Sequence, residues 1–154
     1  MGTSQKKEPN VSGTEKELTP DQTLGLVSLS LMQKLSQKDP SFSWLEEDKI
    51  EKVNHCLKLV GLENINKKMP SEISGGMKKR VGIARAIVND SKYLFCDEPN
   101  SGLDPLTAIK IDNLILEITK KLNTTTIIVT HDMNSVVEIG EYIMFLHNGK
   151  KLWE

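Results

Sequence analysis

Hydrophobic and polar residues follow a clear period from Glu46 onward, and their spacing predicts a succession of helices and strands. In residues 46–61, four apolar side chains recur at helical spacing, at positions 50, 53, 57 and 60, before a glycine at position 61. That pattern predicts an amphipathic helix. A second helix is expected over roughly residues 75–89, with an apolar side formed by Val81, Ile83, Ala84, Ile87 and Val88.

Two short apolar runs, KYLFCDE at 92–98 and TTTIIVTH at 124–131, predict strands. Because their hydrophobicity is continuous rather than alternating, we expect both faces of each strand to be buried, as in a parallel sheet. Asp104-Pro105 supplies an N-cap and a first helical residue for a helix that reaches about Leu122. A short helix over residues 132–140 and a hairpin around Asn148-Gly149 follow. The order predicts an α/β fold with a mainly parallel sheet, flanking helices and a C-terminal hairpin.

The first part of the chain lacks these signals. Residues 1–22 are polar and without a period, which is typical of a disordered segment. Residues 23–44 alternate apolar and small polar residues, which fits a strand or a weak helix. We therefore expect residues 1–44 to be a separate N-terminal segment and residues 45–154 to be the organised domain.

Composition narrows the classes of function. A formal net charge of −1 over 154 residues gives no electrostatic reason for binding nucleic acid. The two cysteines, Cys56 and Cys96, lie in apolar segments and are expected to be buried thiols rather than metal ligands. No apolar run is long enough to cross a membrane, and no signal peptide is evident, so a membrane role would require a partner.

Candidate chemistry lies at the ends of the predicted strands, where parallel sheets bind ligands. Asp97 closes the first strand and suits Mg²⁺, which takes one or two carboxylates together with phosphate oxygens. Glu98, one residue on, is placed to accept a proton from an attacking water. His131 closes the second strand. Taken singly, an acid pair or a terminal histidine is more often structural.

Ser74-Gly75-Gly76 opens the second predicted helix, and helix N-termini bind phosphate through their unpaired N–H groups. Ser74 is equally explained as an N-cap, and so is Asp104. Three cations, Lys78, Lys79 and Arg80, lie in the first turns of this helix, where they oppose the helix dipole. A solvated basic face is the simpler explanation, although a nearby anion would offset the repulsion.

In their order and spacing, these segments resemble the motifs of the ATP-binding-cassette (ABC) ATPase family. ISGGM resembles the signature motif, YLFCDE the Walker B strand, SGLDP the D-loop and IIVTHD the switch-histidine loop. The resemblance covers roughly residues 46–154. It implies the C-terminal half of a P-loop NTPase domain that hydrolyses ATP to drive transport.

The resemblance also implies roles for matching residues. Glu98 would be the general base, His131 would contact the γ-phosphate, and Asp97 would help to hold Mg²⁺. ATP held by a second ABC ATPase subunit would be contacted by the signature residues Ser74, Gly75, Gly76 and Met77, while Asp104 would act across the dimer interface. Transmembrane permease subunits would be the other partners, at the cytoplasmic face of a bacterial inner membrane.

Met77 stands where the signature usually has glutamine. SGGM followed by basic residues, together with CDEPNSGLDP, is similar to the ATPases of phospholipid-asymmetry (Mla-type) transporters, which implies a lipid substrate. The ribosomal and chromosomal branches of the family fit less well, because the sequence has no tandem cassette and no sustained heptads.

One expected motif does not occur. The 154 residues contain no G-x-x-x-x-G-K-[ST] phosphate loop, the Walker A motif, and Gln33 is a weak candidate for the Q-loop glutamine. Two interpretations therefore remain. The chain is a catalytic part of a transporter ATPase, or it is a non-catalytic fragment that offers only a signature face to an intact partner. In both interpretations, the isolated chain is expected to expose apolar surface and to bind ATP weakly.

Overall fold

The computed structural model describes Leu31 and residues 47–153. The predicted N-terminal segment, residues 1–44, therefore lies outside the described residues except for Leu31, as does the candidate Q-loop residue Gln33. Leu31 is fully buried and belongs to the hydrophobic core. The boundary between the segment and the domain remains a prediction.

The described residues form helices and strands in the order that the sequence predicts. The helices are α2 (Glu47–Leu59), α3 (Gly75–Ile87), α4 (Pro105–Leu122) and α5 (Met133–Ile139), with a short 3-10 helix, η1 (Pro70–Glu72), before α3. The strands are β1 (Tyr93–Asp97), β2 (Thr125–Val129), β3 (Phe145–His147) and β4 (Lys150–Trp153).

Local capping explains where the helices begin and end. Ser74 Oγ accepts a hydrogen bond from the Met77 amide at 3.2 Å, and Asp104 Oδ1 accepts one from the Thr107 amide at 3.1 Å. These bonds satisfy amides that have no partner inside the first helical turn. Asn123 ends α4 in the left-handed region, with φ 50°.

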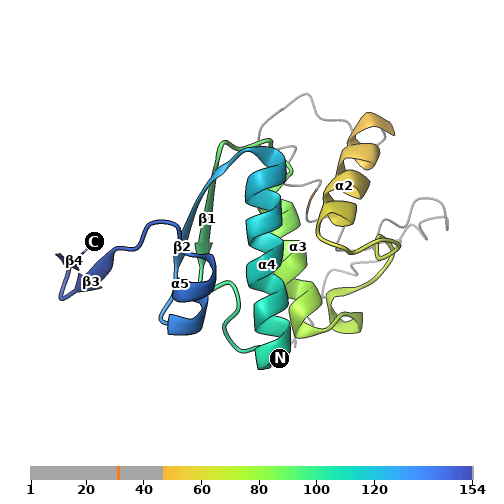
Figure 1. Ribbon diagram of the computed structural model, residues 1–154. Helices are drawn as coiled ribbons and strands as arrows, with labels where there is room; N and C mark the ends of the chain where they lie inside the picture. Colours follow the sequence, from red (N-terminus) through yellow and green to blue (C-terminus); the bar gives the residue numbers. More distant parts are fainter. Residues whose placement is uncertain (1–30, 32–46, 154) are drawn as a thin grey trace, which may run out of the picture.

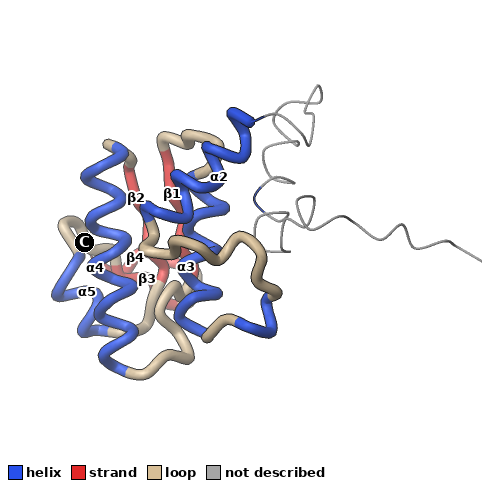
Figure 2. Tube along the Cα trace, turned by 90° about the vertical axis from the view of Figure 1, so that its right-hand side faces the viewer, coloured by secondary structure: helices blue, strands red, loops and turns tan. Residues whose placement is uncertain are grey.

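Strands β1 and β2 pair in parallel, with Tyr93 opposite Thr125 and Asp97 opposite Val129. Helices α3 and α4 lie side by side over one face of this pair, and α2 packs on the outer side of α3 (Figure 1). Viewed from the helical side, the two strands lie behind α3 and α4 (Figure 2). The antiparallel β3–β4 hairpin extends away from this body, on the side opposite α2.

The core lies between the helices and the covered face of the sheet. Leu94 of β1 is 3% exposed and joins apolar side chains of α2, α3 and α4. The core side chains predicted for α2 are confirmed at Val53, Leu57 and Val60, and those of α3 at Val81, Ile83, Ala84, Ile87 and Val88.

The second face of the sheet is open, so the expectation that both faces are buried is wrong for these strands. Phe95 is 70% exposed and Val129 59%, and Tyr93 and Ile127 on the same face are also exposed. The reason is that no element among residues 47–153 packs on this face. Burial therefore alternates along strands whose sequences are continuously apolar.

Candidate functional site

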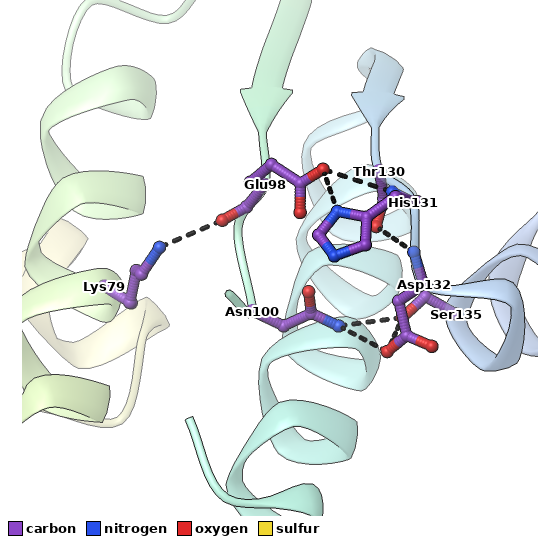
Figure 3. Close-up of polar contacts among 7 residues, drawn as sticks. All are labelled: Lys79, Glu98, Asn100, Thr130, His131, Asp132 and Ser135. Atoms are coloured by element: carbon purple, nitrogen blue, oxygen red, sulfur yellow. Dashed lines mark hydrogen bonds and ion pairs between the residues drawn. The ribbon is translucent and has the colours of Figure 1, made fainter. Parts of the chain in front are cut away.

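The carboxyl ends of β1 and β2 meet at one edge of the sheet, and they bring Glu98 and His131 together. Glu98 Oε1 lies 2.7 Å from His131 Nδ1 and also accepts a hydrogen bond from the His131 amide at 3.1 Å (Figure 3). The Glu98 side chain is 32% exposed and the His131 side chain 84%. This pair therefore stands at the surface, where a ligand can reach it.

The backbone of Glu98 is held in an unusual conformation. Its φ of 46° lies in the left-handed region, which non-glycine residues rarely adopt. Its amide donates to Val129 O at 2.9 Å, and its carboxylate binds His131. Its carbonyl accepts from Lys79 Nζ at 2.9 Å and from the Ser101 amide at 3.3 Å. Backbone strain of this kind is concentrated at functional sites.

The hydrogen bond to Glu98, together with the charge of its carboxylate, raises the pKa of His131 above its ordinary value of 6.5. The negative carboxylate favours the imidazolium form. In that form both ring nitrogens donate hydrogen bonds, so Nδ1 can bind Glu98 while Nε2 donates to a second acceptor.

The signature residues form the start of α3, close to the start of α4. A Cβ added to Gly76 would lie 2.8 Å from Thr107 Cγ2, so no larger residue fits there without movement. The close approach that requires Gly76 is therefore to α4. Ser74 and Gly75 are exposed, whereas Gly76 and Met77 are half-buried.

Asp97 and Asp104 are both exposed. Asp97 takes no part through its side chain in the hydrogen bonds or ion pairs formed among residues 47–153, which leaves its carboxylate available to a hard cation. Hydrogen bonds from the Thr107 side chain and then from the Thr107 amide lower the pKa of the Asp104 carboxyl. Asp104 therefore has a structural role as an N-cap, whatever else it contacts.

The basic residues of α3 differ from the expected solvated face. Lys78 is exposed. Lys79 is half-buried and donates a hydrogen bond to Glu98 O, and Arg80 donates one to Val60 O at 3.4 Å. Sequence reasoning missed the role of Lys79, because its partner lies nineteen residues away in the chain.

Three buried polar residues near this site were also missed: Asn100, Asp112 and Ser135. A signal for Asp112 was available, since it lies on the buried stripe of α4 beside Ile111, Ile115 and Ile118. A carboxylate on an apolar helical face requires hydrogen-bond partners, and these can only come from neighbouring elements.

Comparison with known proteins identifies the family. The family model described as "ABC transporter" matches residues 3–101, well over half of the chain. This chain belongs to the ABC transporter family. The match confirms the resemblance to the ABC ATPase family. The range matched by the family model begins at residue 3, and so it includes much of the predicted N-terminal segment, residues 1–44.

The curated relatives that this chain is similar to include methionine import ATP-binding proteins. MetN 2 of Listeria monocytogenes is 46% identical over 99 residues, which are 64% of this chain and 29% of that protein. MetN of Bacillus subtilis is 42% identical over 109 residues, 71% of this chain and 32% of that protein. The chain thus spans less than a third of the length of these relatives. They give no support to a special closeness to Mla-type ATPases.

Solved structures confirm the fold. The ATP-binding cassette MJ0796, in a dimeric post-hydrolysis state with ADP and phosphate, has a TM-score of 0.68 at 28% identity; the match covers 84% of this chain and 55% of that one. The ADP conformation of MJ1267, a cassette of an ABC transporter, has a TM-score of 0.71 at 26% identity, covering 88% of this chain and 57% of that one. The α/β organisation is thus that of part of an ABC ATPase domain.

Proposed function

We propose that this chain is the catalytic part of the ATP-binding subunit of an ABC transporter, and that Glu98 and His131 carry out the hydrolytic step. The observation that carries the proposal is the 2.7 Å contact between Glu98 Oε1 and His131 Nδ1 at the ends of two parallel strands. Both residues lie in the segments that resemble the Walker B strand and the switch-histidine loop of the family.

In this mechanism Glu98 accepts a proton from the water that attacks the γ-phosphate of ATP. The left-handed backbone and the Lys79 contact hold the carboxylate beside His131, so the base does not have to be ordered during the reaction. His131 uses Nδ1 for Glu98, and its Nε2 donates to the γ-phosphate in the imidazolium form. The raised pKa of His131 favours that form.

Asp97 would hold Mg²⁺, and the exposed carboxylate at the end of β1 suits this cation. When bound, Mg²⁺ neutralises charge on the phosphate oxygens during transfer. The signature residues Ser74, Gly75, Gly76 and Met77 would contact ATP held by a second subunit at the N-terminus of α3, where helix N-termini favour phosphate. Asp104 would act across the same interface.

The phosphate loop required for turnover must come from outside these 154 residues, because none of them forms the G-x-x-x-x-G-K-[ST] pattern. We therefore expect the chain alone to bind ATP weakly and to hydrolyse it negligibly.

The names of the relatives favour a methionine-type importer over a phospholipid transporter. The partners would be a second ATP-binding subunit and transmembrane permease subunits, through which the chain would associate with the cytoplasmic face of a bacterial inner membrane. Within the described part of the chain, no helix has the length and apolar character needed to cross a membrane.

A second candidate function follows from the missing phosphate loop. In it, the chain performs no hydrolysis and offers only the signature residues at the start of α3 to an intact partner, whose own base does the chemistry.

Steady-state ATP hydrolysis with Mg²⁺ separates the two functions. In the first arm, the chain is co-expressed with the N-terminal part of the Bacillus subtilis methionine import protein, which supplies a phosphate loop. Turnover that Glu98→Gln abolishes supports the catalytic function.

In the second arm, the chain is mixed with that relative in intact form but with its own signature serine replaced by arginine. Turnover found only here, retained by Glu98→Gln and lost in Ser74→Arg, would overturn the catalytic function in favour of the second candidate. Turnover by the chain alone would show that the phosphate site lies within residues 1–44.

A further inference from the structure

A buried polar cluster lies beneath the Glu98–His131 pair, and the proposed mechanism does not use it. Its members are Asn100, in the loop after β1, Asp112 of α4 and Ser135 of α5. They are 5%, 3% and 3% exposed. The salt bridges among the described residues do not include Asp112. This buried carboxylate therefore accepts hydrogen bonds from neutral groups.

The three side chains satisfy one another. Asn100 Nδ2 donates to Asp112 Oδ2 at 3.1 Å and to Asp112 Oδ1 at 3.3 Å. Asn100 Nδ2 also donates to Ser135 Oγ at 2.8 Å, and Ser135 Oγ donates to Asp112 Oδ2 at 2.7 Å. Asp112 thus accepts from two elements that lie twelve and twenty-three residues away in sequence.

The cluster connects to both halves of the Glu98–His131 pair. Asn100 follows Glu98 by two residues. On the other side, Asp132 directly follows His131, and its Oδ2 accepts from Ser135 Oγ at 3.2 Å and from Asn100 Nδ2 at 3.5 Å (Figure 3). The loop after β1 and the segment after β2 are therefore both linked by hydrogen bonds to the Asp112 carboxylate on α4.

Apolar side chains of similar volume would fill this space without the desolvation cost of a buried carboxylate. A buried network, in contrast, allows few alternative geometries, because each arrangement that leaves a donor or acceptor unpaired is costly. The His131 side chain, which is 84% exposed, has little packing of its own to fix it. Its position depends on the loop that Asp132 and Ser135 hold.

We propose that Asn100, Asp112 and Ser135 are positioning residues that hold the loop after β1 and the loop after β2 in register, so that Glu98 and His131 meet. The catalytic meaning of this register rests on the proposed function. The register itself is a property of the chain and can be measured without nucleotide.

An exchange of the two partner residues tests the proposal. Asn100→Asp places two carboxylates face to face, and Asp112→Asn places two amides face to face. The double variant restores an amide–carboxylate pair with position 112 in the opposite direction, with Ser135 Oγ accepting from the new amide and donating to the new carboxylate. The new carboxylate at position 100 still faces Asp132, which accepts from Asn100 Nδ2 at 3.5 Å in the wild type, so the restoration is partial. Asn113→Asp, at an exposed position on α4, is the control for added charge.

The measurement is native-state amide hydrogen exchange by NMR, without ATP. The His131 amide reports the register directly, because it donates to Glu98 Oε1. Each single variant is expected to accelerate its exchange by about tenfold or more, with α3 amides unchanged, and the double variant to exchange more slowly than Asn100→Asp, because it removes the repulsion at position 112. If the other single variants fail to fold, Ser135→Ala takes their place, because it changes no charge. It is expected to accelerate exchange of the His131 amide by a smaller factor.

Unchanged exchange at His131 in the folded single variants, or in Ser135→Ala, would overturn the proposal. A double variant whose His131 amide exchanges as fast as that of Asn100→Asp would do the same. Since no turnover enters the measurement, failure of the register and failure of the catalytic function are distinguishable.

Discussion

Leu94 and Phe95 are neighbours in β1 but differ in burial, so alanine at each position tests whether the second face of the sheet is open in solution. Leu94 is 3% exposed and Phe95 is 70% exposed. Leu94→Ala should lower the free energy of unfolding by about 2–5 kcal/mol, the range for truncating a buried leucine. A fully buried phenylalanine loses about 3–5 kcal/mol, so a side chain with less than a third of its surface covered should lose about 1 kcal/mol.

Urea unfolding followed by circular dichroism measures both variants against the wild type. With a slope of about 1–3 kcal/mol per molar urea, a difference of about 2 kcal/mol separates the two midpoints by about 1 M. Phenylalanine is favoured in strands, so the loss of strand propensity adds to the cost of Phe95→Ala and narrows the expected difference rather than creating it. Equal destabilisation at the two positions would refute the reasoning, because it would mean that the face carrying Phe95 is covered in solution.

The same face gives a reason for self-association. Tyr93, Phe95, Ile127 and Val129 are each more than two-fifths exposed, and burying such a side chain further is worth about 1–2 kcal/mol. The total is comparable to the association cost of about 4 kcal/mol or more, so we expect weak, concentration-dependent association. Sedimentation velocity should show it, and Phe95→Lys should reduce it. A monomer at every concentration would count against this expectation.

Three further outcomes are expected. Ser74→Ala should lower the free energy of unfolding by about 1 kcal/mol in urea titrations, while Ser74→Thr, which can also cap α3, should lower it less. NMR titration should place the His131 pKa above 6.5, and Glu98→Gln should move it back; the stabilisation from this pair is complete below 6.5 and is lost as the pH rises through the folded-state pKa. Burial raises the pKa of Cys96 and of Cys56 to about 11, so both thiols should react slowly with iodoacetamide at neutral pH until urea unfolds the chain.

The helices, the strands and the hairpin could be predicted because their signals are local. Asp104-Pro105 fixes the start of α4 within the first helical turn, and Asn148-Gly149 fixes the β3–β4 hairpin by its turn conformation, with positive φ at both residues. The positions of Glu98 and His131 followed from strand ends, because parallel strands finish at the same edge of a sheet.

The sequence by itself thus determined the order of the elements, the family resemblance and the placement of Glu98 and His131 at the carboxyl ends of the two predicted strands. Their direct contact is a finding of the tertiary structure. Only the tertiary structure decided that Lys79 holds the Glu98 carbonyl, that Asn100 and Ser135 converge on Asp112, and that one face of the sheet stays open. The physical reason is that capping and turn conformation depend on residues within one turn of each other. A hydrogen bond across elements, or the covering of a sheet face, depends on packing between segments far apart in the chain.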